Sequence, residues 1–311
     1  LAMFTMRQIA AKVNTAFVSL WAVTVLLFFS IVVFSTGFSL ASMFSDQLEE
    51  NTQFDASIRA SFMGLDTSDM EAVPPEQYGG YEEKKARIDE VKAQRNEIHG
   101  LWQANSGSTV AYMKSLIPDW DERVTGSAQV DTWLATDLTN KQLIDACGFT
   151  LEQVGSDEDS TMAGEGVQYV TLSQFNTARQ LTGEKPIELG AGEYLVDNTV
   201  DKSAEYAKVL GQKGRTITVD GHELTASGQV VSQSLQVSNM SCLIAVLVVP
   251  DELAAERFAA GDLPYLSELN VNLVGDSKEQ AMEDLMAEYG KSVPPREELA
   301  EAGWTYDSRP W

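Results

Sequence analysis

The chain has 311 residues with 46 acidic and 22 basic side chains, which gives a formal net charge of −24 at pH 7. A surface this acidic repels phosphate groups and excludes nucleic acid as a partner on electrostatic grounds. With only two histidines, His99 and His222, histidine-rich zinc sites and catalytic triads are hard to build.

An uncharged segment near the start of the chain predicts a transmembrane helix. From Val13 to Ser45 there is no Asp, Glu, Lys, Arg or His, a run of 33 residues. A helix needs about 20 residues to cross a bilayer, whereas the apolar part of a cleaved signal peptide has only about 7–15. We therefore expect a juxtamembrane segment over 1–15 and a single membrane-spanning helix over 16–44. The apolar side chains expected within the membrane are Phe17, Trp21, Val25, Leu26, Phe28, Phe29, Ile31 and Phe34.

Charges on either side of this helix predict its orientation. Arg7 and Lys12 precede it, while Asp46 and Glu49 follow it. Because basic residues are retained on the cytoplasmic side, we expect a cell-membrane protein with a cytoplasmic N-terminus and an extracellular domain over 45–311. The extracellular part holds 20 basic and 46 acidic side chains, a net charge of −26. Such a charge either keeps the exterior well solvated or attracts cationic ligands.

The extracellular part interleaves expected strands and helices. Alternating or continuous apolar residues predict strands, and the nine-residue run at 241–249 is too short to span a membrane. Asp220-Gly221 is the pair typical of a type I′ hairpin turn. The expected strands are 54–62, 129–138, 167–170, 192–198, a hairpin within 214–227, 241–249 and 268–276.

The expected helices follow from helical spacing and from capping residues. Residues 81–102 place Ile88, Val91, Ile98 and Leu101 on one stripe. The others are 140–148, a helix from a cap at Thr171 or Ser173 to Gly183, 251–261 and 277–290. Strands and helices alternate without a strict βαβ rhythm, which favours an α+β domain.

The acidic loop at 155–166 is the clearest internal break and marks a candidate sub-domain boundary. Asp157 and Asp159 begin like a calcium-binding loop. Met162, however, stands where that loop requires glycine, and Gln168 stands where it requires a closing glutamate. We expect no metal site here.

Motifs for catalysis and nucleotide binding are missing from the sequence. His222-Glu223 lacks the second histidine of a zinc protease motif, and no GxSxG or phosphate-binding GxxxxGK[ST] occurs. We therefore expect no catalytic residue, no cofactor and no enzyme activity. Cys147 and Cys242 are the only cysteines, and they either pair outside the cell or remain two free buried thiols.

Four segments of the sequence together resemble one known family. The stretch "MFTMRQIAAKVNTAFVSLWAVTVLLFFSIVVFSTGFSLA" at 3–41, with its basic start at Thr5–Lys12, resembles the span that opens the second half of FtsX-like ABC transporter permeases of the MacB and bacitracin-resistance type. Similar to parts of their extracellular domain are "LSQFNTARQLTGEKPIELGAGEYLV" at 172–196, "IAVLVVPDELA" at 244–254 and "LNVNLVGDSKEQA" at 269–281. The order and spacing of the segments carry the resemblance.

The resemblance implies a permease subunit, present here as a fragment, because such permeases have further membrane spans. It implies a separate cytoplasmic ABC ATPase as partner, the lipid bilayer as surroundings, and an extracellular domain that couples ATP hydrolysis to an envelope substrate. In the bacitracin-resistance branch that substrate is an antimicrobial peptide or a lipid-linked precursor. The net charge of −26 would suit a cationic peptide.

Two other classes of protein fit the same residues. A single-pass, membrane-anchored extracellular binding protein or adhesin would use the helix only as a tether. A secreted hydrolase would need a cluster of acids together with His99 or His222 in one cleft.

Overall fold

The chain divides into two units, Leu1–Glu50 and Asn51–Trp311. The computed structural model describes parts of the second unit: residues 53–61, 70–71, 73–156, 161–233, 235, 245–275, 278–292 and 304–308. The expected transmembrane helix 16–44, and its flanking residues Arg7, Lys12, Asp46 and Glu49, lie outside these described residues. Within the described ranges, no helix combines the length and the hydropathy that crossing a membrane requires.

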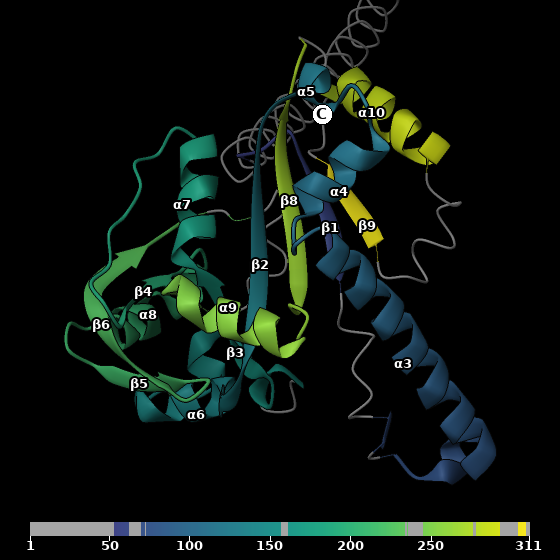
Figure 1. Cartoon of the computed structure of the whole chain (residues 1–311). Helices are drawn as coiled ribbons and strands as arrows, with labels where there is room; N and C mark the ends of the chain where they lie inside the picture. The colour runs from purple at the N-terminus through teal and green to yellow at the C-terminus, as the bar shows by residue number, and fades with distance from the viewer. Residues whose placement is uncertain are drawn as a thin grey trace, which may run out of the picture. The chain divides into compact units, whose positions relative to one another are not determined.

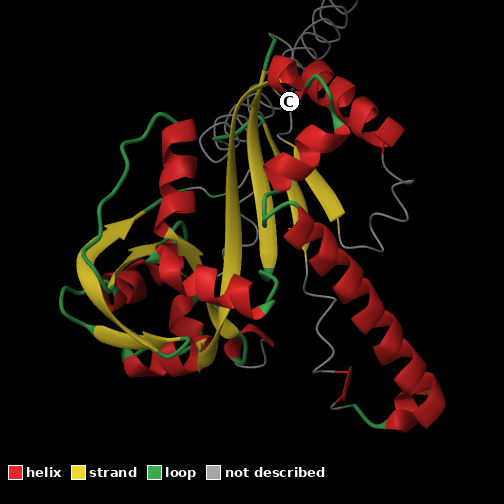
Figure 2. Cartoon of the chain, in the orientation of Figure 1, coloured by secondary structure: helices red, strands yellow, loops and turns green. Residues whose placement is uncertain are grey.

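Residues 51–311 build a mixed domain of helices and strands, as the sequence predicts (Figures 1 and 2). Its described strands join in one sheet in the order β5-β6-β4-β7-β3-β2-β8-β1-β9. The pairs β3–β7 and β4–β6 are parallel, and the other neighbours are antiparallel. The strands are β1 Ala56–Ser61, β2 Val124–Thr139, β3 Gly166–Thr171, β4 Glu193–Asp197, β5 Thr216–Val219, β6 His222–Val231, β7 Val246–Val249, β8 Leu266–Leu273 and β9 Trp304–Ser308.

β2 is the strand that joins the two parts of the sheet. It has 16 residues, and its pairing changes along its length. Val124 to Thr132 pair with β8, whereas Trp133 to Thr139 pair with β3. One continuous strand therefore carries both the β1–β8 part and the β3–β7 part.

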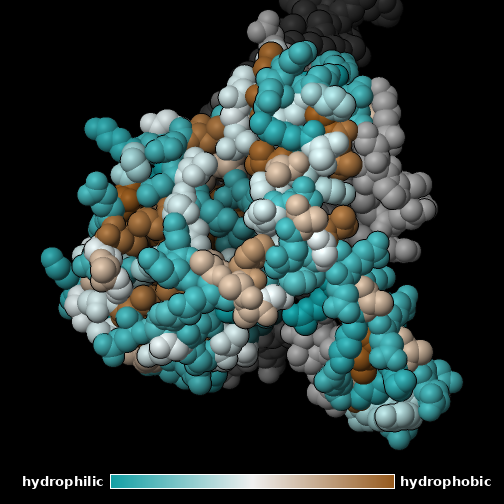
Figure 3. All heavy atoms as spheres, viewed as in Figure 1, coloured by the Kyte–Doolittle hydropathy of each residue, from teal (hydrophilic) through white to brown (hydrophobic). Residues whose placement is uncertain are grey.

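Helices cover both parts of the sheet, and short 3-10 turns connect them (Figure 2). The helices are α3 Tyr81–Ala104, α4 Thr109–Leu116, α5 Trp120–Arg123, α6 Asn140–Ala146, α7 Leu172–Leu181, α8 Ala204–Leu210, α9 Asp251–Ala260 and α10 Lys278–Ser292. The 3-10 turns are η2 Pro75–Tyr78, η3 Glu152–Val154, η4 Thr161–Ala163 and η5 Asp201–Ser203. The surface of α3 is largely hydrophilic (Figure 3), as expected for a helix with many charged side chains.

Alternate residues of β7 show how the sheet is packed on both faces. Leu247 and Val249 belong to a core cluster that also contains side chains of α6, α8 and α9. Val246 and Val248 belong to the cluster on the opposite face, which includes Phe175 and Ala178 of α7. All four β7 side chains are buried, which confirms the second half of the interior strand expected over 241–249. Residues 241–244 of that expected strand lie outside the described residues. A third cluster joins β1 and β8 to α4 and α10.

Two details of burial differ from the sequence-based expectation. In α3, Leu101 is 44% exposed, while Trp102 is only 5% exposed. Both lie one turn from Ile98, and the larger apolar surface of the tryptophan occupies the buried position. In β8, the polar residues Glu268 and Asn270 are buried as well. They are tolerated because Arg59 pairs with Glu268 at 2.8 Å, and Ser57 donates a hydrogen bond to Asn270.

The remaining predictions concern single strands and helices and the hairpin turn. The expected strand at 54–62 and the helices at 81–102, 140–148, 251–261 and 277–290 are confirmed, with shifts of a few residues at their ends. The hairpin is confirmed too. Asp220 and Gly221 both have positive φ, 49° and 80°, as a type I′ turn requires. α4, α5 and α8 were not anticipated.

Candidate functional site

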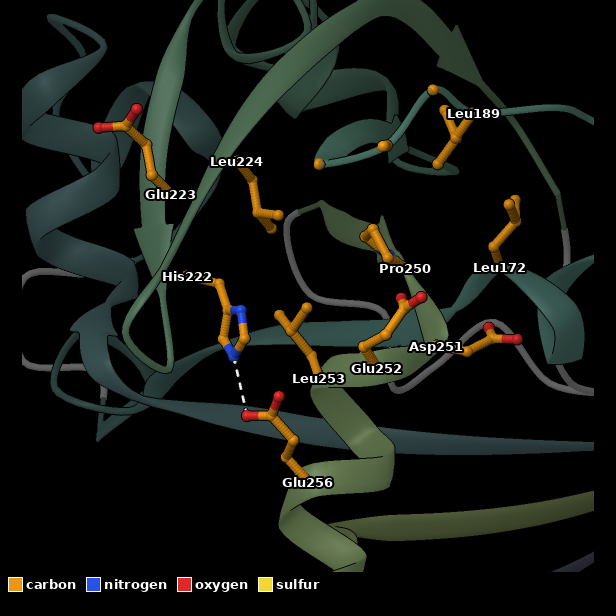
Figure 4. Close-up of a pocket in the computed structure, with 13 residues that line it drawn as sticks. Leu172, Leu189, His222, Glu223, Leu224, Pro250, Asp251, Glu252, Leu253 and Glu256 are labelled. Carbon is orange, nitrogen blue, oxygen red and sulfur yellow. Dashed lines mark hydrogen bonds and ion pairs between the residues drawn. The ribbon is translucent and has the colours of Figure 1, made fainter.

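A groove of about 550 Å³ opens between the loop that precedes β4, the start of β6 and the start of α9 (Figure 4). These three segments are distant in the sequence and meet through the β4–β6 and β4–β7 pairings. The lining residues are Leu172, Leu189, Gly190, Ala191, Gly192, His222, Glu223, Leu224, Pro250, Asp251, Glu252, Leu253 and Glu256.

The start of α9 forms one wall because β7 ends at Pro250. Proline cannot continue the ladder, and its φ of −57° leads directly into the helix. Asp251 and Glu252 occupy the first turn, where acidic side chains interact favourably with the helix dipole. The Asp251 carboxylate also accepts a hydrogen bond from the Ser173 backbone N–H at 3.0 Å, which ties the start of α9 to the start of α7.

The start of β6 forms the opposite wall. Successive side chains of a strand point to opposite faces, so His222 and Leu224 share a face that Glu223 does not. Figure 4 shows this directly: His222 and Leu224 point into the groove, and the Glu223 carboxylate points away from it. Leu224 is only 2% exposed and contributes to the floor.

The turn before His222 is held in place by the Asp220 carboxylate. Its Oδ1 accepts hydrogen bonds from the backbone N–H and the hydroxyl of Thr136, both at 2.7 Å. Its Oδ2 accepts from the Tyr169 hydroxyl at 2.7 Å and from Arg257 Nη1 at 3.0 Å. Burial by itself raises the pKa of Asp220. The hydrogen bonds from Thr136 and Tyr169 and the charge of Arg257 outweigh burial, so this pKa lies below its ordinary value.

The same turn is also held through its backbone. The Asp137 carboxylate accepts hydrogen bonds from the backbone N–H groups of Asp220 at 2.7 Å and of Gly221 at 2.8 Å. Arg257 of α9 completes the attachment, because its Nη1 donates to the Leu134 carbonyl at 3.1 Å and its guanidinium lies 5.4 Å from the Trp133 ring centroid. The hairpin wall and the α9 wall are therefore fixed to the same strand, β2.

Besides the Arg257–Asp220 ion pair, the hairpin and α9 have a second polar contact at the edge of the groove. His222 Nε2 lies 3.0 Å from Glu256 Oε2, and the Glu256 side chain is 67% exposed (Figure 4). An exposed pair of this kind contributes about 0–1 kcal/mol, so it can exchange for another partner at little cost.

The groove offers limited chemistry. His222 and Glu256 together could deprotonate a water molecule, which is the arrangement that the hydrolase interpretation needs. The lining residues include no serine, threonine, cysteine, tyrosine or lysine that could act as a covalent nucleophile. An apolar floor with acidic groups at the edge can accommodate a ligand that has an apolar part and a polar or cationic part.

Other residues singled out from the sequence lie apart from the groove. His99 is on α3, with its Nε2 3.2 Å from Gln103 Nε2. Cys147 is buried, and burial raises the pKa of its thiol. Cys242 lies outside the described residues, so the pairing stays a prediction.

Metal binding finds no support in the part of the chain that the structure describes. No group of three or more His, Cys, Asp or Glu side chains there is placed to hold a metal ion. Asp157 and Asp159 of the acidic loop lie outside the described residues.

Sequence reasoning missed most of the groove. It considered His222 only as a component of a hydrolase and did not single out Glu252, Glu256 or Leu189. The signal available was the acidic first turn of the helix at 251–261, but no local sequence pattern placed that turn opposite residue 222.

Neither the protein-family models nor the curated proteins contain a match to this chain.

Proposed function

We propose that the chain is part of an ABC transporter permease subunit, in which a single transmembrane helix at 16–44 precedes an extracellular α+β domain that binds an envelope ligand. The observation that carries this proposal is a ligand-sized groove in a compact domain whose sequence directly follows an uncharged run of 33 residues. The resemblance of the segments at 3–41, 172–196, 244–254 and 269–281 to permeases of the FtsX type supports it.

In this proposal the ligand is an antimicrobial peptide or a lipid-linked precursor, and the groove is the binding site. Its volume of about 550 Å³ is within the range of sites for small ligands or for one or two side chains of a peptide. ATP is hydrolysed by a separate cytoplasmic subunit, and the helix at 16–44 transmits the resulting movement to the domain.

The way the groove is built suits this role. Arg257 and Asp220 attach the α9 wall and the hairpin wall to the same strand, β2. The exposed His222–Glu256 contact is the weak element between them. A ligand that replaces this contact changes the interaction between the walls without breaking the anchoring network.

Thiol labelling of intact cells tests the membrane arrangement. In a full chain with Cys147 and Cys242 replaced by serine, the substitution Glu205→Cys places a thiol at a side chain that is 77% exposed. We expect a membrane-impermeant maleimide to label this thiol in intact cells. Labelling that appears only after lysis would place the domain inside the cell and overturn the proposal.

Association with an ATPase separates the permease from its closest alternative, a membrane-anchored binding protein or adhesin. We expect the chain, together with the remaining spans of its subunit, to co-purify from membranes with an ABC ATPase whose activity changes when ligand is added. External labelling without any associated ATPase would favour the anchored binding protein.

A further inference from the structure

The groove is lined by leucine side chains that leave an open volume above them. Leu224 and Leu253 are buried to 2% and 3% exposure and form the base. Leu172 and Leu189, at intermediate exposure, pack against the core cluster of the opposite sheet face and line the other side of the open volume (Figure 4). Apolar side chains that are half exposed in a concave site gain from being covered by an apolar part of a ligand.

The charges around this floor have a single sign. Glu252 and Glu256 lie on one face of α9, since residues four apart are neighbours on a helix. Both are exposed, and Figure 4 shows the Glu252 carboxylate near Pro250, on the groove side of the helix. No lysine or arginine is among the lining residues, so His222 is the one basic side chain of the lining. An anionic group in this groove would meet the carboxylates of Asp251, Glu252 and Glu256, with no lysine or arginine in the lining to compensate them.

We propose that the groove binds one basic side chain of a polypeptide, a lysine or an arginine. The alkyl stem of that side chain covers Leu172 and Leu189, and its ammonium or guanidinium group lies between the carboxylates of Glu252 and Glu256. Long basic side chains combine an apolar stem with a charged head, which matches an apolar floor with an acidic edge.

Binding in this way changes one contact that the structure shows. In the structure, Glu256 Oε2 lies 3.0 Å from His222 Nε2, and the cation of the ligand would replace this histidine as the partner of Glu256. Asp251 is less available, because it already accepts the Ser173 backbone N–H. The inference rests on the proposed role of the groove as a ligand site and chooses between the two ligands left open there. It favours the peptide over a lipid-linked phosphate.

A matched pair of peptides tests the charge requirement on the purified full chain in detergent micelles. One peptide is acetyl-Leu-Arg-Leu-amide, and the other replaces arginine by citrulline, which keeps the shape of the side chain and removes its charge. Measured by isothermal titration calorimetry, we expect the citrulline peptide to bind at least about tenfold more weakly, because it loses both carboxylate contacts. We expect the arginine peptide to lose affinity when the salt concentration is raised.

Three matched variants locate the site. Glu252→Gln and Glu256→Gln should each weaken binding of the arginine peptide by about fivefold, the effect of losing one exposed ion pair. Glu205→Gln makes the same change of charge on α8, outside the groove lining, and should leave affinity within about twofold. Circular dichroism spectra of all three variants should match that of the parent chain, since all three side chains are exposed.

The outcomes separate this inference from the proposed function. Equal affinity for both peptides, no binding of either, or equal loss in all three glutamine variants would overturn it. Binding of a polyprenyl pyrophosphate in preference to the arginine peptide would also overturn it while leaving the permease proposal in place. Binding of the arginine peptide as expected, by a domain that is labelled only after lysis, would retain the inference and reject the permease.

Discussion

Two regions along β2 are each organised by an aspartate, buried at Asp131 and partly buried at Asp220, and they differ in the groups that surround the carboxylate. Near the end of β2, Asp220 meets the charge of Arg257 in addition to hydrogen bonds from Thr136 and Tyr169. In the middle of β2, Asp131 receives hydrogen bonds from Gln129 and Gln174 at 2.6–3.0 Å, and none of these donors is charged.

The pKa values of the two carboxyl groups are shifted in opposite directions. Burial raises the pKa of Asp131 above its ordinary value, and the hydrogen bonds from Ser267, Gln129 and Gln174 only reduce this effect. At Asp220 the hydrogen bonds and Arg257 overcome burial, so its pKa is lowered. Hydrogen bonds lower the pKa at both sites. The two sites differ in that Asp131 is more completely buried and that Asp220 also meets the charge of Arg257.

Removing Asp220 should have the largest effect on stability. Asp220→Ala leaves Arg257 half-buried without one of its carboxylate partners and leaves the donors of Thr136 and Tyr169 unpaired. We expect the free energy of unfolding to fall by about 3 kcal/mol, measured by urea denaturation. Glu223→Ala, two residues beyond the turn and exposed, is the control and should change it by less than about 0.5 kcal/mol. A loss below about 1 kcal/mol in Asp220→Ala would show that the network does not anchor the hairpin.

The effect of burial on the pKa of a carboxyl group can be tested by a pH series at another aspartate, Asp197, which is buried. Burial raises the pKa of Asp197 to about 8, opposed by a hydrogen bond from the Gln233 backbone and by the charge of Arg179. The folded protein therefore keeps a proton on Asp197 that the unfolded chain releases above about pH 4. Between pH 4 and 8 this group makes stability fall as pH rises, by at most about 1.4 kcal/mol per pH unit.

Asp197→Asn removes that proton while keeping an oxygen that can accept the Gln233 N–H, now bonded at 2.8 Å. We expect the variant to lose less stability than the parent chain between pH 5 and 8 in urea titrations. Identical slopes for the two proteins would mean that Asp197 is ionised in the folded state. Asp220, with its lowered pKa, has the opposite sign, because its contribution is present above about pH 4 and is lost in acid.

Because the hydrogen-bond donors around Asp131 are neutral, replacing this aspartate by asparagine should cost less stability than Asp220→Ala. Asp131→Asn keeps one acceptor for Gln129 or Gln174 and breaks no ion pair. We expect a loss of about 1 kcal/mol at pH 7, well below that of Asp220→Ala. The same urea titrations check this, and a loss as large as that of Asp220→Ala would show that a nearby cation is not what distinguishes the two sites.

The smallest effect should come from the exposed contact across the groove. His222→Ala removes the partner of Glu256 without touching the anchoring network. We expect the free energy of unfolding to change by less than about 1 kcal/mol, because a polar contact at an exposed side chain contributes little. A loss above about 2 kcal/mol would contradict the view of this contact as an exchangeable one.

Much of the local structure was determined by the sequence, because short-range chemistry is sufficient for it. Asp220-Gly221 predicts a type I′ turn from the backbone preferences of two residues, and the turn has that conformation. Pro250 followed by an acidic turn predicts the start of α9, and the continuous apolar run predicts β7 as an interior strand. Each of these features depends on neighbours within a few residues.

Tertiary structure decided which side chains share a site. Glu268 and Asn270 look like the polar face of an alternating strand, yet both are buried because Arg59 and Ser57 of a distant strand pair with them. The groove likewise needs the 189–192 loop, His222 and α9 to meet, and that meeting depends on the pairing of β4 with both β6 and β7. Strand order within a sheet is set by the summed packing of residues far apart in the chain, and no local pattern in the sequence encodes that sum.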